Sequence, residues 1–350
     1  MFLLLAVFYV ECSKVERTVV VNKKTTNKMK ERVLSLDVAR VLCVMWIVCF
    51  WHMNQYMENN YRFFLAESDS YDIYWYITNG VLACFTLLSG FFMSQKKIEG
   101  FDDIIYFYKK RFKRFFIPLF ITSLLLVPLK YLTIFQVLTT CLGISQFVSP
   151  PYPKTLWFFS MMIFFYLFTP FVLYIKRHNE KYGILALVLI YVLLIAGVVI
   201  YNIDKRLIEY YVFYAVPFLL RKPQSLIPLP YTRSIYIVFV LIAIILCIQL
   251  PNVDRDYQVF IWNFVTCYVI LYFSSLIALF KILNMGKIIM LLSYSSMFAY
   301  LFHREVYIAS TLLLGKYTYV EAALFACILF ILSYYGQYYY DYCLKNKKLL

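Results

Sequence analysis

The sequence predicts an all-α bundle of about ten transmembrane helices with both chain termini in the cytoplasm, a multi-pass protein of the cell inner (plasma) membrane. Three observations predict this fold class. Hydrophobic residues make up 63% of the chain and charged residues only 15%, which is far from the composition of a soluble domain. Apolar runs of nearly twenty residues recur from end to end. The Lys and Arg residues gather in alternate connecting segments.

The expected spans follow from these apolar runs. The sixth is short and contains Pro217, so it is expected to be broken or tilted. In chain order the spans are residues 34–53, 73–94, 115–133, 156–175, 184–202, 210–220, 235–250, 261–280, 289–307 and 320–340.

The basic residues set the orientation of these spans. They concentrate in the N-terminal tail, in residues 95–114, 176–183, 221–234 and 281–288, and in the C-terminal tail. These segments are therefore assigned to the cytoplasmic side. The other loops hold few basic residues and eight acids, which are Glu58, Glu67, Asp69, Asp72, Asp204, Glu209, Asp254 and Asp256.

Composition also excludes several classes of function. The net charge of +15 follows membrane topology, so nucleic acid is not expected as a partner. The nine cysteines are scattered without a Cys-x-x-Cys pair, and only Cys141 falls in an expected outer loop. Neither a disulfide framework nor a metal site is indicated, and the chain has only three histidines.

The first 28 residues are expected to stand apart from the membrane domain. Residues 1–11 form a short apolar run without the flanks of a secretory signal, and a polar, basic stretch follows. We interpret 1–28 as an extension that precedes a true start at Met29, with an amphipathic anchor as the alternative. Residues 29–350 then form the membrane domain.

The first span carries ionisable groups at both ends. Asp37 and Arg40 are three residues apart and share a helix face, which favours an ion pair between them. His52 lies twelve residues after Arg40, about 18 Å along a helix axis. Ionisable groups inside a membrane usually face a protein interior or a wet cavity. The alternative is that both residues simply sit at the two interfaces.

The inner segment YFYKKRFKRFFIP, residues 106–118, interleaves aromatic residues with five cations. Arg111 and Arg114 are three apart, so on a helix their guanidinium groups project from one face. Such forked groups suit phosphate. A juxtamembrane stretch that holds anionic lipid headgroups is the alternative.

Two later spans carry further candidate residues. Trp157 opens the span LWFFSMMIFFYLFTP at the outer interface, where a tryptophan is often only a belt residue. In SYSSMFAYLFH, residues 293–303, polar side chains recur at spacings of three and four, so they line one face. Tyr300 and His303 close this stripe toward the outer side. The small pair Ser89–Gly90 permits close helix approach.

In their order, these pieces resemble acyltransferase family 3, integral-membrane acyltransferases that modify surface carbohydrates and similar acceptors. The matching pieces are LDVARVL…FWH, LLSGFFMS, YKKRFKRFFIP, LWFFSMMIFFYLFTP, YAVPFLL and SYSSMFAYLFH, which together span residues 35 to about 305. The resemblance implies that His52 is catalytic and that Arg40, Arg111 and Arg114 bind the acyl donor. His303, Trp157 and Tyr300 are candidates to shape the acceptor end.

The chain departs from the family pattern in two places. Ten residues usually separate the first-helix basic residue from the histidine, whereas eleven separate Arg40 from His52. One extra residue rotates the imidazole by about 100° on a regular helix, and a π-bulge would absorb that offset. Arg304 and Glu305 follow the last histidine, where the family often has proline.

The resemblance implies transfer of an acyl group, expected to be acetyl, from cytosolic acyl-CoA to a hydroxyl of a surface carbohydrate or lipid-linked sugar. Acyl-CoA is then a co-substrate, with no bound cofactor, and membrane lipid surrounds the bundle. A different class stays open, an exporter or flippase for a polysaccharide or lipid-linked sugar, because many spans with polar groups also suit transport. A polymerase is disfavoured because the chain lacks a long outer loop.

Overall fold

The computed structural model describes residues 34–56, 70–148, 156–220, 255–280, 286–315 and 318–346, with isolated positions between 237 and 244. Within these ranges every regular element is helical, which confirms the predicted all-α class. The elements are α2 (Leu34–Met45), η1 (Trp46–His52), η2 (Met53–Tyr56), α3 (Ser70–Ser94), α4 (Phe101–Arg111), η3 (Phe112–Phe116), α5 (Ile117–Leu125), α6 (Ile134–Cys141), α7 (Trp157–His178), α8 (Glu180–Tyr201), α9 (Arg206–Leu219), α11 (Arg255–Phe280), α12 (Gly286–Leu314) and α13 (Tyr319–Lys345). The predicted extension 1–28 and most of the predicted span 235–250 lie outside the described residues.

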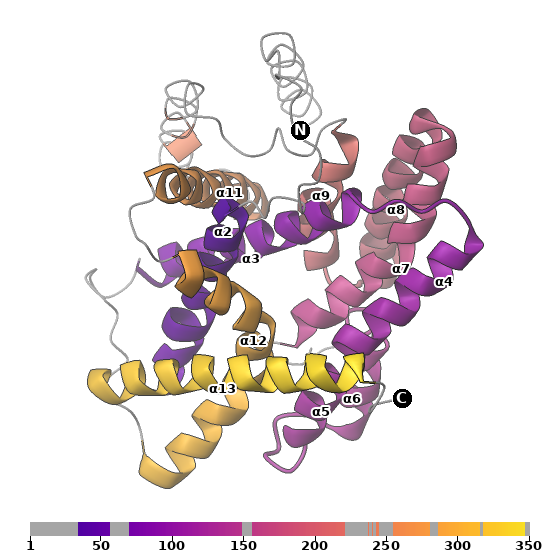
Figure 1. The fold of residues 1–350 in the computed structure, drawn as a ribbon. Coiled ribbons are helices and arrows are strands. Elements are labelled where there is room, and N and C mark those ends of the chain that lie inside the picture. The colour runs from indigo at the N-terminus through magenta and orange to yellow at the C-terminus, as the bar shows by residue number, and fades with distance from the viewer. Residues whose placement is uncertain are drawn as a thin grey trace.

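The first helix lies inside the bundle. α2 packs against α11 and α12, while α3 packs against both α9 and α11. In Figure 1, α2 and α3 lie near α11 and α12, α7 and α8 stand together on the other side, and α13 crosses below them. Asp37 and His52 are buried among these helices, so they face protein instead of lipid.

Six helical stretches of the described chain are long and apolar enough to cross a membrane. They overlap predicted spans and identify a membrane protein. In order they are Leu34–His52, Tyr74–Ser94, Trp157–His178, Glu180–Tyr201, Asp256–Ala278 and Val320–Leu344.

The predicted span 115–133 differs from the observed helix. Helical structure runs without a break from Phe101 to Leu125 through α4, η3 and α5, so it begins in the basic stretch and ends before residue 133. Pro118 has no N–H to donate, and the wide π-helical turn η3 ends two residues before it. After α5 the chain turns at Lys130, whose φ is 58°.

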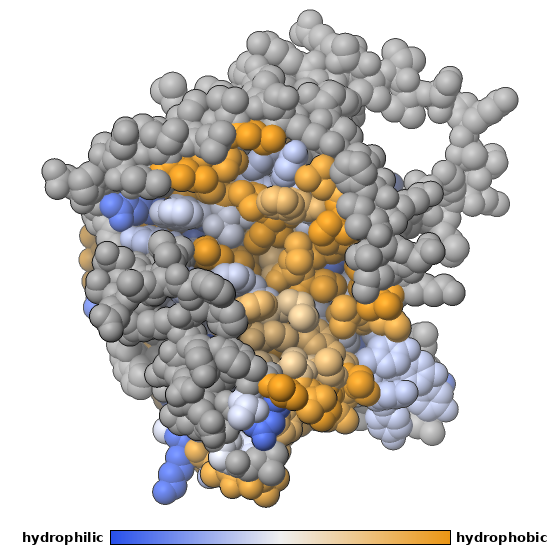
Figure 2. Space-filling model, turned by 90° about the vertical axis from the view of Figure 1, so that its left-hand side faces the viewer, coloured by the Kyte–Doolittle hydropathy of each residue, from blue (hydrophilic) through white to orange (hydrophobic). Residues whose placement is uncertain are grey.

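Large apolar side chains cover much of the outer surface. α8 is the most exposed of the six candidate spans, and residues such as Leu193, Val199 and Ile200 are more than half exposed. Figure 2 shows a broad apolar area among the described residues of one face. A surface of this kind suits contact with lipid chains.

α3 and α9 approach each other closely at Gly90. A Cβ atom at this position would overlap the backbone carbonyl of Tyr214, which cannot move without α9. The close helix approach predicted from Ser89–Gly90 is therefore confirmed at Gly90.

We expect Gly90→Ala to destabilise the protein by about 1–3 kcal/mol, because the added methyl group overpacks two backbones. Thermal unfolding in detergent measures this loss. Gly100→Ala is the matched control, because nothing lies within 4 Å of the Cβ it would add. Equal unfolding temperatures for the two variants would contradict the close contact.

Candidate functional site

A π-helical turn carries the histidine of the first helix. η1 spans Trp46–His52, and the N–H of Met53 donates to the carbonyl of Val48, five residues earlier. A regular α-helix makes this bond four residues back. The turn therefore accommodates one extra residue, as the interval of eleven residues between Arg40 and His52 predicts.

The first helix and α12 run parallel and are joined at both ends. At one end the Arg40 guanidinium donates to Ser293 Oγ at 3.2 Å. At the other end His52 meets His303. His52 lies twelve residues after Arg40, whereas His303 lies only ten residues after Ser293. The π-helical turn takes up one of these two extra residues, and His52 and His303 meet within hydrogen-bond distance.

Asp37 is held more closely by Ser293 than by Arg40. Ser293 Oγ donates to Asp37 Oδ1 at 2.7 Å, whereas the nearest Arg40 nitrogen lies 3.9 Å from the same oxygen. The predicted pair of Asp37 and Arg40 therefore exists as a three-residue cluster, with the serine hydroxyl between the charges.

The two histidines are buried and share a hydrogen bond. His52 Nδ1 and His303 Nε2 are 2.7 Å apart. Their ring centres are 4.7 Å apart and the planes differ by 9°. This geometry fits a hydrogen bond made roughly in the plane of both rings.

The partner of His303 determines where the protons lie. His303 Nδ1 is 2.7 Å from the carbonyl oxygen of Tyr300, which can only accept. His303 Nδ1 therefore carries the proton, and Nε2 of the neutral ring accepts from His52 Nδ1–H. The lone pair of His52 then lies on Nε2, free to take a proton from a substrate.

His52 faces a cavity of about 560 Å³ with aromatic walls. Trp51, Trp75, Trp157 and Tyr300 line it together with His52. The structure thus brings together four predicted residues from distant parts of the chain, namely His52, Trp157, Tyr300 and His303, the last through its bond to His52.

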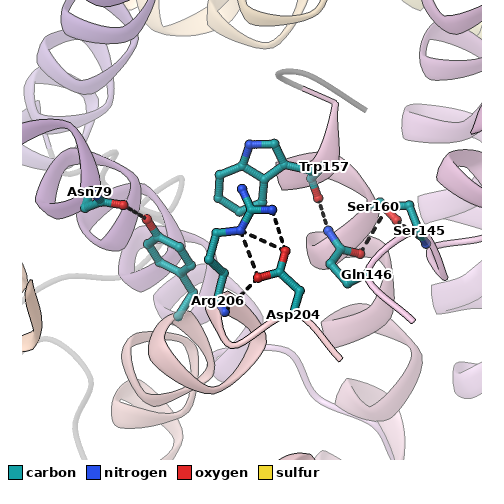
Figure 3. A network of polar contacts seen from close by, with 8 residues as sticks. Asn79, Ser145, Gln146, Trp157, Ser160, Asp204 and Arg206 are labelled. Carbon is teal, nitrogen blue, oxygen red and sulfur yellow. Dashed lines mark hydrogen bonds and ion pairs between the residues drawn. The ribbon is translucent and has the colours of Figure 1, made fainter. Parts of the chain in front are cut away.

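Charged groups form another part of the cavity wall. Arg206 donates from Nε to both carboxylate oxygens of Asp204, at 2.9 and 2.8 Å. Its guanidinium lies 4.0 Å from the centre of the Trp157 ring. Figure 3 shows this arrangement, in which Arg206 lies between the indole and Asp204. The paired charges hold Trp157 in place.

Further hydrogen bonds fix the positions of residues in this wall. The Gln146 side-chain amide donates to the Trp157 carbonyl, and the Tyr210 hydroxyl donates to Asn79 Oδ1 at 2.9 Å (Figure 3). The Asp204 N–H donates to the Gln146 carbonyl at 3.2 Å. The wall is therefore preorganised by hydrogen bonds from three segments.

Glu209 is the one carboxyl of the described cavity wall without a hydrogen bond or ion pair to a described residue. It lies in the first turn of α9, before the predicted span 210–220. Burial raises the pKa of Glu209 to about 7, against the opposing effect of Lys205.

We expect Glu209→Gln to change how stability depends on pH. The folded protein holds this proton up to about pH 7, whereas the unfolded chain releases it near 4.5. Stability is therefore lost as pH rises between these values, by about 1.4 kcal/mol per unit at most. Thermal unfolding in detergent at pH 5 and pH 8 measures this. The unfolding temperature of the variant, relative to that of the wild type, should be higher at pH 8 than at pH 5. Glu99→Gln, at an exposed carboxylate, is the control, and parallel pH dependence of Glu209→Gln and wild type would contradict the shift.

The predicted donor arginines lie at the other end of α12 from His303. Arg40 contacts Ser293, ten residues before His303 and about 15 Å along the helix. Arg40 also lies 5.0 Å from the Phe92 ring centre. The charge of Arg114 acts on the neighbouring Tyr294 hydroxyl and on Arg111. All three guanidinium groups thus gather away from the histidines.

An aromatic cage holds Arg111. Its guanidinium carbon lies 5.5 to 5.8 Å from the ring centres of Phe107, Phe115 and Tyr166. Arg111 is partly buried and Arg114 is exposed, so the two do not present equal surfaces as a regular helix face would. The π-helical turn η3 between them explains the difference.

Five further cavity residues were not predicted from the sequence as site residues, namely Asp204, Arg206, Glu209, Trp51 and Trp75. The acids were noted only as outer-loop residues. For Asp204, Arg206 and Glu209 the available signal was their position next to the short predicted span that contains Pro217. A short span leaves its flanking charges near the bundle interior.

Comparison with known families agrees with the resemblance. Neither a curated protein nor a solved structure gives a significant match. The model of an acyltransferase domain, that of acyltransferase family 3, matches residues 33–339, which include the cavity wall, both histidines and all three arginines. This match covers most of the chain, so the protein belongs to acyltransferase family 3 and is a membrane acyltransferase.

Proposed function

We propose that the protein transfers an acyl group, with acetyl as the expected group, from cytosolic acyl-CoA to a hydroxyl of a surface glycan or lipid-linked sugar. The observation that carries the proposal is the His52–His303 pair, with His52 on the wall of an aromatic cavity. Both termini are cytoplasmic in this proposal, the ten predicted spans cross the plasma membrane, and the cavity opens to the outer side. The parallel course of α2 and α12 supports that topology, in which both helices run outward.

The chemistry follows from the proton positions. His52 Nε2 takes the proton of the acceptor hydroxyl as its oxygen attacks the thioester carbonyl. A C–O bond forms and the C–S bond breaks, and the leaving thiolate takes the proton back from His52. While His52 is an imidazolium, its Nδ1–H stays bonded to His303, which stabilises the positive charge.

The cavity supports a carbohydrate acceptor. Its three tryptophans and Tyr300 offer flat surfaces for the apolar faces of a sugar ring, and its carboxylates accept hydrogen bonds from hydroxyl groups. A pocket with apolar walls and a few placed polar groups is typical of small-molecule sites. The Glu209 carboxyl, which has no described partner, is available to such an acceptor.

Labelled acetyl-CoA tests the proposal. Membranes that contain the protein are incubated with it, and carbohydrate is then extracted. We expect alkali-labile label in this fraction above the level in membranes that lack the protein. The same level in both would contradict acyl transfer to carbohydrate.

Replacement of Arg111 and Arg114 by Lys tests donor binding. Lysine keeps the charge but loses the planar fork and the stacking on three rings. We expect a raised acyl-CoA concentration at half-maximal rate, with unchanged abundance in the membrane. Lys109→Arg with Lys110→Arg is the control, because these cations are exposed. Unchanged kinetics in the double Lys variant would favour lipid headgroups as the partner.

A further inference from the structure

The Tyr307 hydroxyl contacts the π-helical turn that carries His52. Tyr307 follows His303 by one turn of α12 and is completely buried. Its hydroxyl donates to the Val48 carbonyl at 3.2 Å. α12 therefore presents two neighbouring side chains to η1: His303 contacts the His52 ring, and Tyr307 contacts the backbone that determines where that ring lies.

The Val48 carbonyl takes part in the π-helical hydrogen bonding of η1. It accepts from Met53 N–H, five residues on. In a regular helix the same carbonyl would accept from the N–H of His52. The Tyr307 hydroxyl is thus a second donor to a carbonyl whose backbone bond belongs to the π-helical register and not to the α-helical one.

The register decides where His52 points. If residues 46–52 wound as a regular helix, the extra residue would rotate the imidazole by about 100° and carry it away from His303. The contact of Arg40 with Ser293 holds the start of the helix, so rotation there cannot compensate. A rotated ring would also leave the cavity wall that His52 now shares with Tyr300.

We propose that Tyr307 is a positioning residue for acyl transfer, which holds the π-helical register that aims His52 at the cavity. This inference rests on the proposed function of His52. The role follows from the interval of eleven residues between Arg40 and His52. A chain with ten would reach the same position by a regular helix and would not need the hydroxyl.

Tyr307→Phe removes only the hydroxyl. We expect the maximal rate of acyl transfer to fall by about 10- to 100-fold, because a small misplacement of a catalytic group is costly. The acyl-CoA concentration at half-maximal rate should not change, since the arginines lie at the other end of α12. Tyr211→Phe is the matched control, because Tyr211 is also buried and its hydroxyl donates to the Leu187 carbonyl at 3.1 Å. Equal rates in the two variants would overturn the proposal.

Deletion of Phe50 separates positioning from general packing. Phe50 lies in η1 and its side chain is 59% exposed, so its loss removes little internal contact. The deletion leaves ten residues between Arg40 and His52 and allows a regular helix. We expect the shortened protein to transfer acyl groups with a rate that no longer depends on the Tyr307 hydroxyl. An equal loss on Tyr307→Phe in both backgrounds would show a packing role and overturn the proposal.

If the shortened protein fails to reach the membrane, the comparison of Tyr307→Phe with Tyr211→Phe still decides the inference. His52→Gln in the same assay separates the proposed function of His52 from the proposed role of Tyr307. Full transfer by His52→Gln would contradict the proposed function itself. Lost transfer in His52→Gln, with equal rates in Tyr307→Phe and Tyr211→Phe, would contradict only the role of Tyr307.

Discussion

His52→Gln is expected to lower the rate of acyl transfer by about 10² to 10⁴-fold, the usual contribution of a general base. Glutamine keeps a polar side chain of moderate size and can still donate to His303 Nε2, so the buried pair does not lose its hydrogen bond. Its amide is far too weakly basic to take the acceptor proton. The loss should therefore appear in the maximal rate, with normal protein abundance.

The third histidine provides the control for this substitution. His178 is exposed at the end of α7, where its Nδ1 lies 2.9 Å from the Tyr174 carbonyl. His178→Gln should leave the transfer rate unchanged. A rate that falls equally in His178→Gln and His52→Gln would contradict a specific role for His52.

His303→Leu is expected to have the next largest effect, a loss of about 10²-fold or more in the maximal rate. Without His303 nothing holds the proton on His52 Nδ1, so the lone pair is no longer directed at the cavity and the imidazolium loses its partner. The acyl-CoA concentration at half-maximal rate should stay near the wild-type value.

His303→Gln distinguishes the hydrogen bond from simple packing. The amide oxygen of glutamine can accept from His52 Nδ1–H, so this variant should retain more activity than His303→Leu. Activity in the order wild type, His303→Gln, His303→Leu, His52→Gln would agree with the proton positions described above. Wild-type activity in His303→Leu would contradict them.

Much of the fold could be predicted because apolar runs of membrane length have few alternatives. The runs at 73–94, 156–175 and 184–202 correspond closely to α3, α7 and α8. The predicted span 115–133 differs from the observed helix because the span was defined by its apolar run, whereas the helix also includes the basic residues of α4 and η3.

The site could be predicted only in part. The interval from Arg40 to His52 indicated a π-bulge because one extra residue must be accommodated within a helix of fixed ends. The bond from His52 to His303 joins residues 251 apart and depends on how α2 and α12 pack, which no local pattern contains. The pairing of Asp204 with Arg206 beneath Trp157 depends likewise on tertiary structure.

The amount of ester-linked acyl group per surface sugar, measured together with total surface glycan, tests the central claim most directly. The comparison needs strains with wild-type protein, His52→Gln and no protein, at matched expression of the first two. We expect His52→Gln to lower the amount of ester-linked acyl group per sugar to the level of the strain without the protein, while total glycan stays constant. A wild-type ratio of acyl to sugar in His52→Gln, with reduced total glycan, would contradict the account and favour an exporter.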